Sequence, residues 1–127
     1  MLLASEVLAQ GENMVCLDEY QICDNELLAK PKFDGLMGHD MIPVSLWIEA
    51  ICQNGELLCR SKTVDLKQMM LTNVSEICIR DLRKLDTRDI WFRTKETAQM
   101  QHYFKSEISV IKGREVLFVC NCTHYIQ

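Results

Sequence analysis

Hydrophobic residues change their spacing between the two halves of the chain. Over residues 44–60, apolar side chains lie on almost every side of a helical wheel, and a helix of this kind is buried in a protein core. Over residues 102–111, apolar and polar positions alternate, with Phe104, Ser106 and Ile108 on one face. The pattern therefore predicts a buried helix followed by strands that each have one buried face.

Turn signals divide the rest of the chain into further strands. Asp24-Asn25 and Lys112-Gly113 mark tight turns. Pro43 opens the helix, because its missing N–H costs nothing at the first helical position. The predicted strands are residues 14–22, 26–32, 77–85, 89–98, 102–111 and 115–126, with a loop over residues 33–42. The order of two strands, one long helix and four strands predicts an α+β fold in which an antiparallel sheet wraps the helix.

Length and composition predict one globular domain, residues 1–127, since 48% of residues are hydrophobic and 25% are charged. The net charge of −4 disfavours nucleic-acid binding, which depends on clustered basic residues. Charges interrupt every apolar run before it reaches the roughly 18 residues of a membrane span. Residues 1–10 lack the basic start of a signal peptide, so we expect a cytoplasmic protein.

The chain contains seven cysteines, an odd number, with no CxxC pair. A structural zinc site needs paired ligands at closer spacing, so no metal site is predicted. We expect the cysteines to be reduced and mostly buried, behaving as small hydrophobic residues.

Polar residues on the predicted helix recur every three or four positions and form one stripe: Ser45, Glu49, Gln53, Glu56 and Arg60. Glu49 lies among apolar neighbours, so we expect it to be partly buried, which favours an acid–base role; a place on a solvated polar face is the alternative. Gln53 lies one turn further on and could hydrogen-bond Glu49 or simply satisfy a helix interface.

The run Glu49-Ala50-Ile51-Cys52-Gln53, with Pro43 six residues before it, resembles the EAxxQ motif on the central helix of bacterial 3-hydroxyacyl-acyl-carrier-protein dehydratases. The apolar run that ends in acidic residues, residues 14–19, resembles the first strand of that family. The similarity covers roughly residues 14–119. It extends to the dehydratase-like proteins of aryl-polyene gene clusters.

This resemblance implies a dimeric hotdog fold and a dehydratase (hydro-lyase) of fatty-acid or polyketide-type synthesis. The acyl thioester would arrive on acyl carrier protein or coenzyme A, its phosphopantetheine arm entering between the subunits, with no other cofactor. Glu49 and His39 would be the catalytic residues. Gln53, Gly38 and Pro43 would bind substrate.

The chain departs from the family in the loop before the helix. The family's catalytic histidine lies in a GHFPxxPxxPG loop, fourteen residues before the helix carboxylate, where this chain has Gly35. His39 lies only ten residues before Glu49. It can therefore take the place of the family histidine only if the loop is shorter in this chain. Since the family site combines histidine and carboxylate from different subunits, a heterodimer with a histidine-bearing hotdog paralogue is an alternative to a homodimer.

Basic residues gather between residues 80 and 95 of this acidic chain. Because carrier proteins are acidic, this segment could dock one; an ordinary solvated face is the alternative. The predicted docking residues are Arg80, Arg83, Lys84 and Arg88. His102 and His124 lie on predicted strands and are interpreted as structural.

Three functions fit these residues. The first is a dehydratase subunit, in which a base removes a proton beside the thioester carbonyl and an acid protonates the leaving hydroxyl. The second is an acyl-thioester hydrolase that uses Glu49 alone. The third is a binder of acyl chains or carrier proteins that has lost catalysis.

Overall fold

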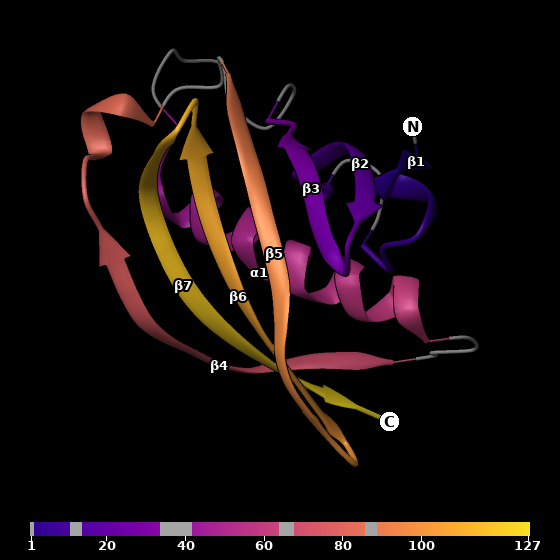
Figure 1. Ribbon diagram of the computed structural model, residues 1–127. Coiled ribbons are helices and arrows are strands. Elements are labelled where there is room, and N and C mark those ends of the chain that lie inside the picture. Colours follow the sequence, from indigo (N-terminus) through magenta and orange to yellow (C-terminus); the bar gives the residue numbers. More distant parts are fainter. Residues whose placement is uncertain (1, 11–13, 34–41, 64–67, 86–88) are drawn as a thin grey trace.

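The computed structural model describes residues 2–10, 14–33, 42–63, 68–85 and 89–127. One long helix packs against a seven-stranded antiparallel sheet, as the α+β prediction requires (Figure 1). The elements are β1 (Leu2–Leu3), the 3₁₀ turn η1 (Ala4–Glu6), β2 (Leu17–Cys23), β3 (Glu26–Pro31), α1 (Val44–Lys62), β4 (Met69–Ile79), the 3₁₀ turn η3 (Leu82–Lys84), β5 (Ile90–Met100), β6 (Tyr103–Lys112) and β7 (Glu115–Ile126).

The order of strands across the sheet is β1-β2-β3-β5-β6-β7-β4. Three pairs of consecutive strands form hairpins: β2 with β3, β5 with β6, and β6 with β7. Strand β3 also pairs with β5, and β4 pairs with β7 at the far edge of the sheet. The predicted turn at Asp24 and Asn25 has φ angles of 52° and 66°, which is the geometry of a two-residue hairpin loop. Gly113, with φ 62°, lies in the turn between β6 and β7.

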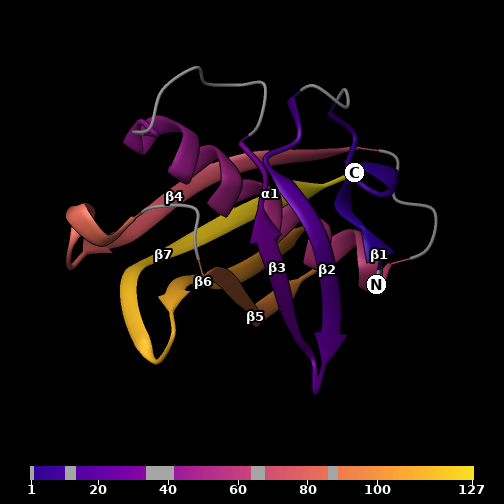
Figure 2. The ribbon, with the colours of Figure 1, turned by 90° about the horizontal axis from the view of Figure 1, so that it is seen from above.

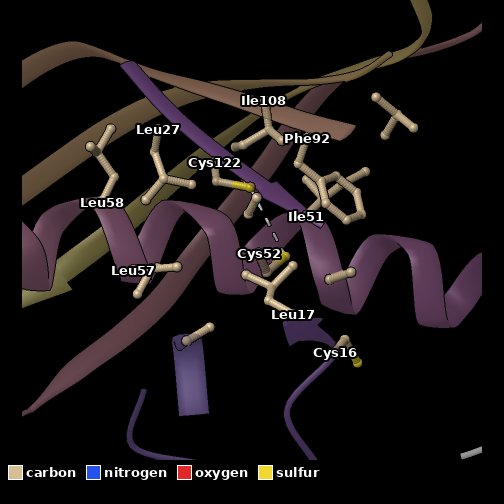
Figure 3. Packing of buried hydrophobic residues seen from close by; sticks show 14 of the residues in the cluster. Cys16, Leu17, Leu27, Ile51, Cys52, Leu57, Leu58, Phe92, Ile108 and Cys122 are labelled. Atoms are coloured by element: carbon tan, nitrogen blue, oxygen red, sulfur yellow. Dashed lines mark hydrogen bonds between the residues drawn. The ribbon is translucent and has the colours of Figure 1, made fainter. Parts of the chain in front are cut away.

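Helix α1 begins directly after Pro43, the N-cap residue, and ends before Thr63. Every residue from 50 to 59 is buried. Figure 3 gives the reason: Phe92 and Ile108 of the sheet pack on one side of α1, and Cys16 and Leu17 pack on the other. No helix in the described residues is long and apolar enough to cross a membrane.

Helix α1 approaches the sheet closely at Gly55. A Cβ atom there would lie 2.8 Å from Ser106 Oγ and 2.9 Å from His124 Cε1. The absence of a side chain at Gly55 therefore sets the distance between α1 and strands β6 and β7.

The predicted strand over residues 77–85 is wrong in its bounds. Strand β4 begins at Met69 and ends at Ile79, and η3 follows it. The register of β4 against β7 shifts between Ser75 and Cys78, which interrupts the alternation of apolar and polar positions. A pattern with period two therefore revealed only the last part of this strand.

Candidate functional site

Glu49 lies in the first third of α1, between the buried residues Trp47 and Ala50, and its side chain is exposed in the single chain. The polar stripe predicted on α1 is consequently not one solvated face. Ser45 and Glu49 are exposed, whereas Gln53 and Glu56 are buried because residues before β2 cover this part of the helix. The partial burial expected for Glu49 is not found in the single chain.

Gln53 fixes one carboxylate oxygen of Glu49. Its Nε2 donates to Glu49 Oε1 at 3.2 Å and to the carbonyl oxygen of Met14 at 2.9 Å. Its Oε1 accepts from the backbone N–H of Cys16 at 2.7 Å. Gln53 is only 1% exposed, so all three hydrogen bonds form on a buried amide.

Cys16 is the site neighbour that sequence reasoning missed. Burial, and after it the negative charge of Glu49, raises the pKa of the Cys16 thiol to about 11. The thiol is therefore protonated near neutral pH and is not a nucleophile. No sequence signal could have placed Cys16 beside Glu49, because the two meet only through the tertiary fold.

An uncovered apolar strip on β4 faces the same side of the sheet as α1. Leu71, Val74 and Ile79 pair across the sheet with His124, Cys122 and Phe118, which are buried beneath the helix. Leu71 and Ile79 are nevertheless 41% and 40% exposed. One helix does not cover the whole width of the sheet: α1 packs against β2, β3, β5, β6 and β7, whereas β4 lies at the edge beyond β7.

Several predicted site residues lie elsewhere or cannot be placed. Gly38, His39 and Arg88, together with Gly35, lie outside the described residues. Pro43 is exposed at the start of α1, six residues before Glu49. The structure therefore places Glu49, Gln53 and Pro43 on one element and leaves the histidine of the expected pair without a position.

Three of the predicted docking residues, Arg80, Arg83 and Lys84, lie in or beside η3, at the end of the molecule where α1 begins (Figures 1 and 2). Arg83 contacts Asp81, with Nε 3.4 Å from Oδ1, although its side chain is 93% exposed. Lys84 Nζ contacts both carboxylate oxygens of Glu115, at 3.0 and 2.9 Å. Arg80 is exposed. Asp81 and Glu115 therefore balance part of the positive charge of this segment, that of Arg83 and Lys84.

His124 is buried beneath Gly55, as its structural interpretation requires, and only 2% of it is exposed. Burial lowers its pKa; the charge of Glu56 opposes this shift and that of Arg60 adds to it. Glu56 accepts from Arg60 Nε at 3.0 Å and from the backbone N–H of Ala9 at 3.3 Å.

Five of the seven cysteines are buried, as expected, and all seven are free thiols in the structure. Cys52 and Cys122 lie with their sulfur atoms 4.0 Å apart in the core (Figure 3). The described residues contain no group of three or more metal-binding side chains arranged to hold an ion.

A pocket of about 350 Å³ lies at the other end of α1, among Arg60, Met69, Met70 and Tyr125. Arg60 is eleven residues from Glu49, which corresponds to roughly 16 Å along a helix. The pocket therefore does not belong to the surface around Glu49.

No protein-family model matches the chain, and no curated protein matches it in sequence. Solved structures do match. The dehydratase heterocomplex ApeI:P from Xenorhabdus doucetiae aligns with a TM-score of 0.79 and 16% identity, over 100% of this chain and 92% of that one. A thioesterase from Haemophilus influenzae aligns with a TM-score of 0.76 and 7% identity, over 97% and 87% of the two chains.

A homologue of HP0420 from Helicobacter felis aligns with a TM-score of 0.70 and 11% identity, over 98% of this chain and 87% of that one. At these identities the likeness concerns the fold alone. The chain has the hotdog fold, a long helix against a curved antiparallel sheet.

Proposed function

We propose that this chain is a subunit of a 3-hydroxyacyl-thioester dehydratase, with Glu49 as its catalytic carboxylate. The observation that carries the proposal is the setting of Glu49. Its side chain is exposed, one of its oxygens is held by the buried amide of Gln53, and the uncovered apolar strip on β4 faces the side of the sheet on which α1 lies. An oriented carboxylate on a partly apolar surface suits a substrate with an acyl chain and an acid–base step.

Dehydration breaks the C2–H and C3–O bonds of the 3-hydroxyacyl thioester and forms the C2=C3 double bond. A base takes the C2 proton, and an acid gives a proton to the C3 hydroxyl, which leaves as water. Glu49 would serve one of these steps through the oxygen that Gln53 does not hold. The other step needs a second group.

A partner subunit with a histidine is our proposal for that second group. Glu49 is solvent-exposed in the single chain, and a subunit that covers it would exclude water from the reaction. A structural neighbour is itself a dehydratase heterocomplex. His39 of the same chain, or of a second copy, is the alternative source.

We further propose that the substrate arrives on an acidic acyl carrier protein that contacts Arg80 and Arg83. These side chains are exposed at the end of the molecule where α1 begins. Reversing both charges, in the Arg80→Glu/Arg83→Glu variant, should raise KM about tenfold for a carrier-bound substrate. KM for the same acyl group on coenzyme A should change much less.

The proposal is tested with protein purified from its native host, so that any partner is retained. Water loss from a 3-hydroxyacyl carrier protein is followed by mass spectrometry for wild type, Glu49→Gln and Glu107→Gln. Glu107 lies on β6 and faces away from α1, which makes it a matched control. Glu49→Gln should lower kcat at least about a hundredfold while Glu107→Gln does not; equal rates for both variants would refute a catalytic Glu49.

A thioesterase is the second candidate, because a single oriented carboxylate can act as base or nucleophile and one structural neighbour is a thioesterase. Steady release of free thiol that disappears in Glu49→Gln would favour it over the dehydratase. Substrate binding without dehydration or thiol release, in the protein isolated with its partners, would favour a non-catalytic binder.

A further inference from the structure

A short segment before β2, residues 14–16, is hydrogen-bonded at both of its ends to one side chain of α1. The carbonyl oxygen of Met14 accepts from Gln53 Nε2 at 2.9 Å, and the backbone N–H of Cys16 donates to Gln53 Oε1 at 2.7 Å. The carbonyl oxygen of Cys16 accepts in turn from the backbone N–H of Lys32, at 2.7 Å. The segment is therefore held beside Gln53, although it lies outside the strands.

Met14 is the one residue of this segment with an exposed side chain. Val15 and Cys16 are 3% and 1% exposed and belong to the hydrophobic core, whereas Met14 is 59% exposed. The core therefore anchors the segment, and the thioether of Met14 lies at the surface. A large apolar side chain on an anchored backbone favours the binding of a ligand that removes it from water.

Met14 lies close to Glu49. Gln53 Nε2, which donates to the carbonyl oxygen of Met14 at 2.9 Å, also donates to Glu49 Oε1 at 3.2 Å. Two acceptors of the same amide nitrogen lie within roughly 6 Å of each other. Methionine is unbranched and has three rotatable bonds, so its side chain can adapt to a ligand that sits at the exposed carboxylate.

A 3-hydroxyacyl thioester has one part that suits such a side chain. Its carbonyl oxygen, its C3 hydroxyl and the amides of the pantetheine arm all need polar partners. Only the carbons beyond C3 form an apolar chain, and the thioether of methionine is an apolar, polarisable group that forms only weak hydrogen bonds. With C2 and C3 at Glu49, the apolar side chain beside this carboxylate suits the carbons that follow.

We propose that Met14 contacts the acyl chain of the substrate beside Glu49 and favours chains longer than four carbons. This inference rests on the proposed function, because it takes Glu49 as the group at the reacting carbons. A four-carbon substrate has a single carbon beyond C3 and gains little from the contact. Each further methylene that Met14 covers is removed from water and strengthens binding. Met14 thus determines specificity and takes no part in the proton transfers.

Calorimetric binding of S-octyl-pantetheine and S-butyl-pantetheine, two thioethers that cannot lose water, tests this proposal on the protein purified from its native host. Met14→Ala should weaken binding of S-octyl-pantetheine about tenfold, since the removed atoms no longer shield the chain. Binding of S-butyl-pantetheine should weaken by less than about twofold. Met14→Leu, which keeps an apolar side chain of similar volume, should retain most of the affinity for S-octyl-pantetheine.

Met100→Ala is the matched control, because Met100 is 55% exposed at the end of β5, and it should leave both affinities unchanged. Equal weakening of both ligands by Met14→Ala would assign Met14 to the folding of the site and overturn the inference. Equal affinities of Met14→Ala and Met100→Ala for S-octyl-pantetheine, or no binding by wild type, would overturn it too.

The two proposals fail separately. If Met14→Ala weakens binding of S-octyl-pantetheine but Glu49→Gln retains full dehydration activity, the catalytic proposal fails and the acyl contact stands. If dehydration depends on Glu49 but Met14→Ala binds S-octyl-pantetheine as wild type does, the reverse holds.

Discussion

Gln53 joins two parts of the chain that are 37 residues apart in sequence, because its Oε1 accepts from the backbone N–H of Cys16. The same amide donates to Glu49, four residues earlier on α1. A residue that is 1% exposed thus connects the core to the exposed candidate carboxylate. Stability and orientation at the site depend on the same three hydrogen bonds.

Gln53→Leu keeps most of the volume and removes all three hydrogen bonds. We expect the free energy of unfolding to fall by about 2–4 kcal/mol, since the buried N–H of Cys16 loses its partner. Urea unfolding measures this, with the m-value unchanged. Gln21→Leu, at an exposed position on β2, is the control and should change stability by less than about 0.5 kcal/mol. Equal effects would mean that the Gln53 hydrogen bonds contribute nothing.

His124 makes stability depend on pH. Its pKa is lowered from 6.5, chiefly by burial, so the unfolded chain binds the proton more readily than the folded one. The free energy of unfolding should therefore be fully retained above about pH 6.5 and decrease as pH falls below it. Thermal unfolding of wild type and His124→Gln at pH 7.5 and 5.5 checks this. The loss of thermal stability between pH 7.5 and 5.5 should disappear in His124→Gln. If it persists in that variant and disappears in His102→Gln, the pH dependence does not come from His124.

At the scale of elements, α1 is buried over residues 50–59 only because the N-terminal segment covers the side that the sheet does not. Glu56 fastens that segment. It is 8% exposed, pairs with Arg60, and accepts from the backbone of Ala9 and the side chain of Gln10.

Glu56→Ala should release residues 2–10 from the helix, because it removes all of these contacts and leaves Arg60 without this carboxylate. We expect a loss of about 3 kcal/mol. Hydrogen–deuterium exchange should rise first in residues 2–10. Glu6→Ala, at an exposed position of η1, serves as control. Unchanged exchange in residues 2–10 would show that apolar contacts such as Ala4 hold the segment instead.

The elements that could be predicted from the sequence are those with a local signal. The apolar residues of α1, Pro43 before it and the turn at Asp24 and Asn25 carry such signals, and the structure agrees with them. The hydrogen bond between Gln53 and Glu49 is also local, one helical turn apart. The start of β4 at Met69 was missed because the bulge at Glu76 interrupts the alternation, and the place of Cys16 beside Glu49 depends on tertiary packing.

At the scale of the whole molecule, one helix against seven strands leaves part of the sheet uncovered. Four exposed apolar residues, Met70, Leu71, Ile77 and Ile79, lie on β4 at the free edge, and Glu49 is an exposed position on α1. We expect the proposed partner subunit to cover both the apolar strip and Glu49, because both are exposed in the single chain.

This geometry predicts that stability depends on assembly. A partner at 100 times its Kd adds about 2.7 kcal/mol, which for a domain of this size raises Tm by roughly 10 °C. Tm of the isolated chain and of the complex from the native host should differ by about this amount. This difference in Tm should be smaller for the Leu71→Thr/Ile79→Thr variant. The isolated variant should keep its own Tm within a few degrees, because both side chains are already about 40% exposed. If the isolated chain and the complex melt together at every protein concentration, the strip on β4 is not an interface, and Glu49 must act on a surface open to water.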